Sequence, residues 1–226
     1  LSEVLMSSVK WSHSSLKDFE NCARRYHEVK VLKKYPQPDT EQTRYGKDLH
    51  RAAELYGRDG TPLPKEFEFI KPTIDAVIAK PGRKYFEYEM ALTEDLRPCG
   101  FKDENVWVRG IADVCIIDDD NLTAWVFDYK TGNNRYPDTQ QLDLMALMVF
   151  AHHPHIRLVK SGLLFVVKDS VVKHRTLLEN ADKMWWRYRE RVAKLAATQA
   201  NNVWNPTQSA LCPWCPVRSC EHHPKH

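Results

Sequence analysis

The sequence predicts an α/β fold in which a mixed central sheet is flanked by helices. Helical patterns come first in the chain, strand-like segments dominate its middle, and helices then alternate with further strands. Such interleaving is typical of a sheet that helices cover on both faces. The 226 residues, 42% of them hydrophobic, suffice for one continuous core. We therefore expect a single domain with a helical part at 12–80, an α/β core at 84–200 and a Cys-rich tail at 204–226.

Helical periodicity predicts three helices in the first part of the chain. Ser14 or Ser15 can provide the N-cap of the first helix, and the second is expected to end near Gly57. The third is expected to stop before Pro81. The predicted ranges are Ser12–Val31, Glu41–Tyr56 and Lys65–Ala79.

Alternating and β-branched apolar runs predict five strands in the rest of the chain. The charged turn Asp118–Asn121 lies between two such runs and predicts a β-hairpin. Two helices are expected among the strands, and Asp138 is a candidate N-cap for the first of them. The strands are expected at Lys84–Thr93, Val106–Ile117, Ala124–Tyr129, Leu158–Val167 and Val171–Leu177, and the helices at Thr139–Ala151 and Ala181–Gln199.

Composition and motifs exclude several classes of protein. No apolar run approaches the eighteen residues of a membrane span, and the first residues lack the pattern of a secretory signal. A cytoplasmic location is therefore expected. The net charge of +3 does not by itself indicate a nucleic-acid partner, although Arg24-Arg25 and other basic clusters are present. The chain has no G-x-x-x-x-G-K-[ST] phosphate loop, so ATP-driven unwinding is not expected of it.

One group of charged residues has the chemistry of a cation site. Asp128 and Lys130 follow an apolar strand and share one of its faces, since successive side chains of a strand alternate. Asp113 lies in the preceding strand, which the hairpin turn places alongside. Carboxylates bind Mg2+ or Mn2+ through oxygen, and a neighbouring lysine can orient water. The alternative is that Asp113 ends a strand and that Asp128 and Lys130 form a surface ion pair.

The six cysteines are unevenly distributed. Without a signal peptide they argue against a disulfide framework. Cys99 and Cys115 fit small core positions. The other group, Cys212, Cys215 and Cys220, has the C-x2-C-x4-C spacing of metal ligands.

Four motifs together resemble the RecB-like nucleases of the PD-(D/E)XK superfamily. They occur in family order over residues 12–220, and the set is far more specific than any single motif. They are G-x-x-x-H at Gly46–His50, G-x-x-D at Gly110–Asp113, D-Y-K-T-G at Asp128–Gly132 and Q-L-x-L-Y-A-L at Gln141–Leu147. The resemblance implies a restriction-endonuclease-like core. Met145 departs from the pattern, because the family usually has tyrosine there.

The resemblance also implies a role for each matched residue. His50, Asp113, Asp128 and the backbone carbonyl of Tyr129 would bind Mg2+ or Mn2+. Lys130 would position or activate the attacking water, and Gln141 would hold that lysine or the substrate phosphate. A further carboxylate is expected from Glu89, or less readily from Glu87, unless these are simply exposed strand residues.

The cysteines resemble those of one branch of this family. In AddAB-type and CRISPR-associated RecB-like nucleases, one early and three late cysteines hold a 4Fe–4S cluster. Here these would be Cys22, Cys212, Cys215 and Cys220. Zinc is the alternative ligand, with His222 or His223 completing the site.

The function implied is that of a metal-dependent DNA exonuclease acting on single-stranded or end-containing DNA in recombination, repair or replication. A separate helicase or recombination protein could assist it, and a phage gene, hence a host cytoplasm, fits its size. Two alternatives stay open: a structure-specific endonuclease, and a non-catalytic DNA-binding subunit that retains the fold.

Overall fold

The computed structural model describes residues 9–36, 39–132 and 135–224, which belong to two compact units. Residues 39–185 form one unit, and residues 1–38 together with 186–226 form the other. Among the described residues, no helix is long and apolar enough to cross a membrane.

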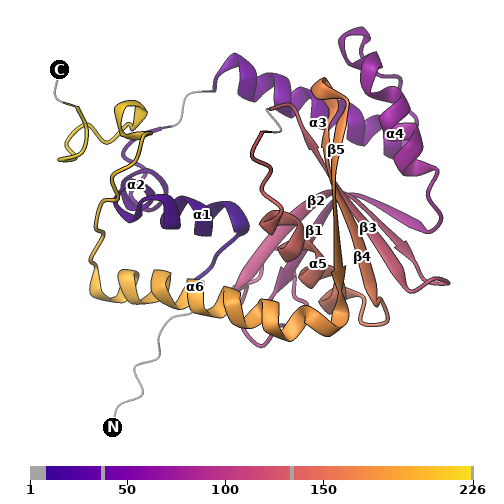
Figure 1. The fold of residues 1–226 in the computed structure, drawn as a ribbon. Coiled ribbons are helices and arrows are strands. Elements are labelled where there is room, and N and C mark those ends of the chain that lie inside the picture. Colours follow the sequence, from indigo (N-terminus) through magenta and orange to yellow (C-terminus); the bar gives the residue numbers. More distant parts are fainter. Residues whose placement is uncertain (1–8, 37–38, 133–134, 225–226) are drawn as a thin grey trace. The chain divides into compact units, whose positions relative to one another are not determined.

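The unit of residues 39–185 is built on a five-stranded mixed sheet (Figure 1). The strands occur in the order β1-β2-β3-β4-β5, and only β3 and β4 run parallel. The other neighbouring pairs are antiparallel. The sheet consists of β1 (Arg83–Leu92), β2 (Val108–Asp118), β3 (Thr123–Lys130), β4 (Leu158–Phe165) and β5 (Ser170–Leu177). The predicted α/β class with a mixed sheet is confirmed.

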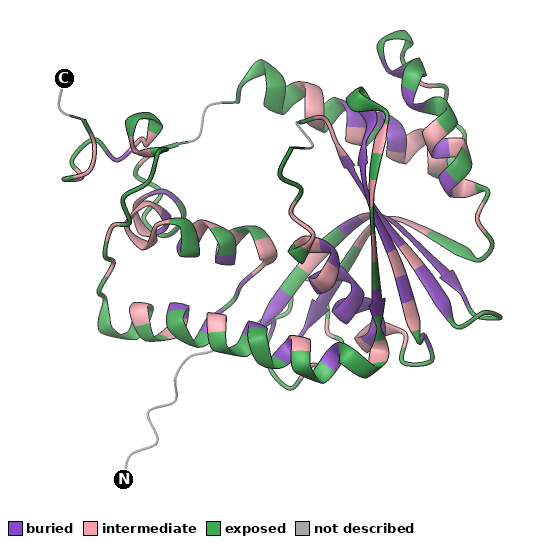
Figure 2. Ribbon diagram, viewed as in Figure 1, coloured by how far each residue is buried: buried purple, intermediate pink, exposed green. Residues whose placement is uncertain are grey.

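Helices cover both faces of this sheet. On one side lie α3 (Glu41–Asp59) and α4 (Lys71–Ile78), and on the other lies α5 (Gln140–His152), which connects the parallel strands (Figure 1). Eight residues of α5 are buried, so this crossover helix fills one side of the core. Buried positions concentrate along the sheet and α5 (Figure 2).

Alternation along β3 sends neighbouring residues to different layers. Phe127 and Tyr129 belong to a core cluster with Leu49 and Ala53 of α3 and with Ile74 of α4. The intervening residues therefore point toward the layer of α5.

The hairpin predicted at Asp118–Asn121 is present, and its turn is fixed by side-chain bonds. Asp118 Oδ1 accepts from the backbone amide of Asn121 at 3.2 Å, and its Oδ2 accepts from the Asn121 side chain at 2.7 Å. Pairing of Ile117 with Ala124 sets the register of β2 on β3.

The second and third predicted helices need correction at their ends. Helix α3 continues through Gly57 to Asp59, because Gly60 adopts the left-handed conformation (φ 70°) and closes the helix. The third helix is two elements, a 3-10 helix at Lys65–Ile70 and then α4. Pro72 explains the division, since it has no amide to donate to the preceding turn.

Later boundaries differ by a few residues. Asp138 Oδ1 accepts from the amide of Gln140 at 3.1 Å, although the N-cap position of α5 is Thr139. Strand β4 stops at Phe165 because a short 3-10 helix, Val166–Lys168, makes the turn into β5.

The other unit contains α1 (His13–Asn21), α2 (Ala23–Tyr26), a π-helical turn (His27–Val31) and a C-terminal tail. Helix α6 (Ala181–Asn201) starts in the unit of residues 39–185 and continues into this one. The expected continuous helix from Ser12 is wrong, because Cys22 is extended (φ −167°, ψ 109°) and separates α1 from α2. The N-cap is Ser12 rather than Ser14 or Ser15: Ser12 and Ser15 bond each other's amides as a capping box.

Candidate metal and catalytic site

The carboxyl end of β3 carries three residues with different surroundings. Tyr129 is buried in the core cluster beneath α3. Asp128, also buried, and Lys130 point the other way, toward Gln141 at the start of α5. The alternation expected from the sequence is therefore observed.

Asp128, Lys130 and Gln141 form a closed polar group. Gln141 Nε2 donates to Asp128 Oδ1 at 2.6 Å, and Gln141 Oε1 accepts from Lys130 Nζ at 3.1 Å. Lys130 Nζ also lies 2.6 Å from Asp128 Oδ2. The amide thus bridges the ammonium group and the carboxylate and fixes the position of both.

Asp113 lies where β2 and β3 separate. The ladder between these strands ends at the pair Val114 and Phe127. Beyond it, Asp113 Oδ2 accepts a 2.6 Å hydrogen bond from the backbone amide of Tyr129. Oδ2 of Asp113 thus accepts the hydrogen bond that a backbone carbonyl would accept in a continuous ladder. The other carboxylate oxygen, Oδ1, remains available for other contacts.

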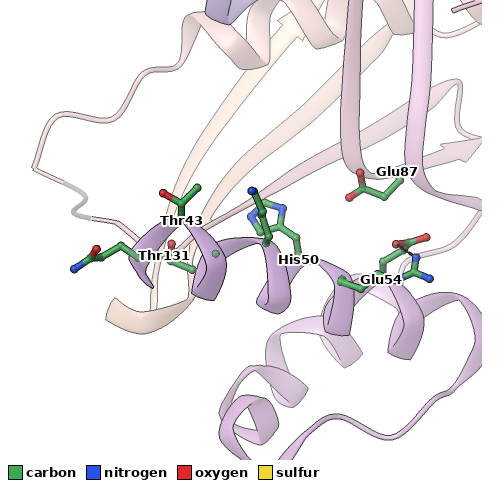
Figure 3. A pocket seen from close by; sticks show the side chains of 9 residues that line it. Thr43, His50, Glu54, Glu87 and Thr131 are labelled. Carbon is green, nitrogen blue, oxygen red and sulfur yellow. Dashed lines mark hydrogen bonds and ion pairs between the residues drawn. The ribbon is translucent and has the colours of Figure 1, made fainter. Parts of the chain in front are cut away.

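Helix α3 brings His50 to the other oxygen of Asp113. His50 Nδ1 lies 3.3 Å from Asp113 Oδ1. Helical spacing places Thr43, Lys47, His50 and Glu54 on one stripe of α3, and all four line the same pocket. This pocket has a volume of about 480 Å³, and Glu87 faces His50 across it (Figure 3).

Glu87 is a member of the site that the sequence ranked below Glu89. The β1–β2 register places Phe86 opposite Val114 and Tyr88 opposite Ala112, so Glu87 falls opposite Asp113. Its backbone has φ 46°, a left-handed conformation that is costly within a strand for a residue other than glycine. Glu89 is exposed, as expected of a solvent-facing strand residue, and it is not one of the three grouped ligand residues. Glu87 could have been predicted from the sequence only if the pairing register of β1 and β2 had been known.

Three of these residues form a cluster of ligand atoms. His50, Glu87 and Asp113 each offer one atom, and the three atoms all lie within 4.8 Å of one another. Two carboxylate oxygens and an imidazole nitrogen suit a hard divalent cation such as Mg2+ or Mn2+. Asp128 lies beside this cluster, with its carboxylate turned to Lys130 and Gln141.

The electrostatics of the site indicate an excess of negative charge. Burial and the charge of Asp113 raise the pKa of Asp128, and Lys130 offsets this only in part. Burial and Asp113 likewise raise the pKa of Glu87. Burial lowers the pKa of His50, but its bond to Asp113 and the nearby carboxylates outweigh burial, and the pKa is raised. A bound cation would relieve this repulsion, so the residues present fit one.

Met145 does not face the pocket. It is buried in α5, a helix that packs on the sheet. The family position usually held by tyrosine is therefore a core position in this chain.

Cys22, Cys212, Cys215 and Cys220 are free and half-buried, and all belong to the unit that contains the tail. Backbone amides point at two of the sulfurs. The Arg25 and Thr207 amides each donate to Cys22 Sγ at 3.5 Å, and the Ser209 amide donates to Cys212 Sγ at 3.3 Å. No three of the four sulfurs lie within 4.8 Å of one another in the described chain.

Two further contacts hold the tail near Cys22. Arg24 Nη2 donates to the carbonyl of Ser219 at 3.3 Å. The rings of His27 and Trp204 stack with their centroids 4.4 Å apart. The early cysteine and the late ones are therefore in the same neighbourhood.

Known proteins resemble this chain in sequence profile and in fold. The sequence profile of the PD-(D/E)XK nuclease superfamily matches residues 10–82 and 72–220. A candidate exonuclease from Eubacterium rectale has a similar structure, with a TM-score of 0.53, 11% identity, and 100% and 96% of the two chains covered. The protein SSO0001 aligns with a TM-score of 0.45 and 17% identity over 97% of this chain and 92% of its own. No curated protein matches the sequence.

Proposed function

Because this chain belongs to the PD-(D/E)XK nuclease superfamily, we propose that it hydrolyses phosphodiester bonds of DNA with Mg2+ or Mn2+. The observation that carries the proposal is the cluster of His50, Glu87 and Asp113 beside the bonded group of Asp128, Lys130 and Gln141. A non-catalytic module would have no use for both groups side by side.

In this proposal His50, Glu87, Asp113, Asp128 and the backbone carbonyl of Tyr129 would hold the cation. When bound, it would polarise a phosphoryl oxygen and lower the pKa of the attacking water. The amide bond from Tyr129 to Asp113 keeps that carboxylate from rotating. Preorganised ligands of this kind need no rearrangement when charge develops on the phosphate.

Lys130 positions the attacking water and offsets negative charge on the phosphate. Gln141 directs the ammonium group from α5, because its amide accepts from Lys130 and donates to Asp128. Asp128 counters the lysine charge while the substrate is absent. The three residues act as a positioning unit at the end of β3.

The preferred substrate in this proposal is DNA with a free end, in single-stranded form. Support comes from the resemblance of the four motifs to RecB-like nucleases and from the open pocket beside His50. Since the sequence contains no P-loop, the protein would act on existing ends or beside a separate helicase. The wider role would lie in recombination, repair or replication.

The test compares a linear single strand with a covalently closed circle of the same sequence. Digestion is followed with Mg2+ or Mn2+ and with an EDTA control. An exonuclease degrades only the linear strand, whereas a structure-specific endonuclease also opens a circle that contains a hairpin or junction. Asp128→Ala should abolish both activities. Activity that survives this substitution would place the chemistry elsewhere. If the wild-type protein and the variant both bind DNA and neither hydrolyses it, the protein is instead a non-catalytic DNA-binding subunit.

We also propose that Cys22, Cys212, Cys215 and Cys220 bind a 4Fe–4S cluster. Amide hydrogen bonds to two of the sulfurs support ligand roles, since such bonds tune clusters of this type. Tetrahedral zinc would bring its thiolates to within about 3.8 Å of one another. The sulfurs of a 4Fe–4S cluster lie farther apart than those of a zinc site, so the two groups place different demands on the tail.

Anaerobic purification tests this cluster. A brown protein with four iron and four sulfide per chain is expected, and Cys22→Ser should lose the colour, whereas Cys99→Ser should keep it. A colourless protein that contains one zinc per chain would instead establish the zinc alternative with His222 or His223.

A further inference from the structure

A second hollow opens on the β3–β5 part of the sheet, on the face opposite to Asp128. Its volume is about 340 Å³. Its floor is aromatic and its rim is basic. The residues that line it include Lys80, Trp125, Phe127, Lys160, Lys173 and Arg175. All belong to the unit of residues 39–185.

Alternation along β5 shows that this face of the edge strand is uncovered. Lys173 and Arg175 are exposed, whereas the intervening His174 is half-buried. On the same face Val171 and Leu177 are 48% and 42% exposed. Apolar side chains would be shielded here if a helix packed against this part of the sheet.

The floor of the hollow consists of the rings of Trp125 and Phe127. Trp125 is half-buried, and Lys80 and Lys160 place Nζ 5.8 and 5.5 Å from its ring centroid. Gly162 stands opposite Phe127 in the ladder, and a Cβ there would lie 3.2 Å from the Phe127 ring. The absence of a side chain at Gly162 keeps the hollow open above that ring.

The charge around the hollow has one sign. Lys80, Lys160, Lys173 and Arg175 line it, and no carboxylate does. Within the described chain, none of the four has an ion-pair partner. Lys160 and Arg175 are directly opposed across β4 and β5, and like charges in that arrangement are destabilising. An anionic occupant would remove this cost.

We propose that this hollow holds a segment of single-stranded DNA outside the hydrolytic site. A base stacks on Trp125, and Lys160, Lys173 and Arg175 contact the flanking phosphates. The aromatic floor selects a nucleic acid over an acidic peptide, which has charge but no base to stack. Trp125 precedes Tyr129 by four residues of β3, about 13 Å along the strand. The proposal rests on the proposed function, because the strand held here is the substrate.

The test measures binding and hydrolysis separately. Anisotropy of a fluorescein-labelled twenty-residue oligothymidylate is followed in EDTA, so that the DNA stays intact. The triple variant Lys160→Glu, Lys173→Glu, Arg175→Glu is compared with the charge-matched Lys65→Glu, Lys84→Glu, Lys102→Glu, whose positions are exposed elsewhere in the same unit. Thermal unfolding of each variant verifies that it is folded.

The triple variant at the hollow, Lys160→Glu, Lys173→Glu, Arg175→Glu, should bind at least tenfold more weakly than the charge-matched triple variant. The salt dependence of its binding should also fall: three lost phosphate contacts lower the slope of log K against log salt by about 2. Trp125→Leu should weaken binding about tenfold, whereas Trp125→Phe, which retains a ring to stack on, should lose less. Equal binding by the two triple variants would overturn the proposal. Displacement of the oligonucleotide by thymidine monophosphate or polyglutamate at equal concentration would do so as well.

Hydrolysis of a small ester, thymidine 5′-phosphate p-nitrophenyl ester, with Mn2+ separates this inference from the proposed function. The ester needs only the hydrolytic site, so both triple variants should cleave it at the wild-type rate. Loss of ester cleavage only in the triple variant at the hollow would overturn the proposal that the hollow is separate from the hydrolytic site. If no protein cleaves the ester or DNA, the proposed function fails while the binding comparison still decides the hollow.

Discussion

Gln141 Nε2 donates a 2.6 Å hydrogen bond to Asp128 Oδ1, and Oε1 of the same amide accepts from Lys130. The first residues of the crossover helix α5 are thus tied to the last residues of β3. In the proposed mechanism the amide touches neither water nor phosphate while it orients the group that does. Gln141 is accordingly a positioning residue.

Gln141→Ala should lower kcat by about 10- to 100-fold with little change in KM, the usual cost of removing a partner that orients an active-site group. Steady-state kinetics on a linear single strand measure both constants. Gln140→Ala is the matched control, since Gln140 is the exposed neighbour on the same helix. A rise in KM at unchanged kcat would instead assign Gln141 to substrate binding.

Glu87→Gln should weaken divalent-metal binding by tenfold or more and should stabilise the metal-free protein. The variant removes one carboxylate from a cluster in which burial and Asp113 raise the pKa of Glu87. Calorimetric titration with Mn2+ gives the affinity, and thermal unfolding in EDTA gives the stability. Glu89→Gln, in the same strand but exposed, should change neither quantity. Unchanged Mn2+ affinity in Glu87→Gln would remove Glu87 from the ligand set.

Gly82→Ala should destabilise the protein by at least about 2 kcal/mol, because the new Cβ adds backbone strain and a clash. Gly82 has φ 112°, and its Cβ would lie 2.4 Å from the backbone carbonyl oxygen of Ile117. Gly60→Ala, with φ 70° but open space, should cost only about 1 kcal/mol. Urea unfolding compares the two, and equal losses would contradict the clash.

Acidification below about pH 6.5 should destabilise the fold through His152 and His153. Burial lowers the pKa of His152, and burial with the charges of His152, His155 and Arg83 lowers that of His153. The unfolded chain therefore binds more protons in this range, so the free energy of unfolding falls as pH drops. Urea unfolding at pH 7.5 and 5.5 measures the slope.

The double variant His152→Gln, His153→Gln should show a smaller loss of stability between these two pH values. His155→Gln provides the comparison: it removes an exposed imidazole that pairs with Asp119 and only one of the charges that lower the pKa of His153, so it should change the slope less. An undiminished slope in the double variant would show that other groups account for it.

Local sequence signals predicted most of the fold. The hairpin before Asp128 was readable because a charged turn separates two apolar β-branched runs, and α5 because its apolar pattern begins beside Asp138. The break at Cys22 was not readable, since Ala23–Tyr26 resumes helical geometry immediately and no proline or glycine marks the interruption. Periodicity continues across such a break even though the backbone does not.

Local sequence likewise predicts some residues of the candidate site and not others. Asp128 and Lys130 share a strand, so their common face follows from alternation alone. Glu87 depends on how β1 pairs with β2 across a long connection, from Thr93 to Trp107, whose length fixes no register. The hollow at Trp125 depends on which part of the sheet α3 and α4 leave uncovered, which no local pattern encodes.

Glu87 also has a consequence for laboratory evolution. Its left-handed backbone is a conformation that glycine adopts freely and asparagine adopts more readily than glutamate. Selection for heat resistance alone should therefore replace Glu87 with glycine or asparagine, whereas selection for cleavage should retain the carboxylate. Parallel populations under the two selections would then diverge at this codon, a trade-off between stability and activity at one strand position.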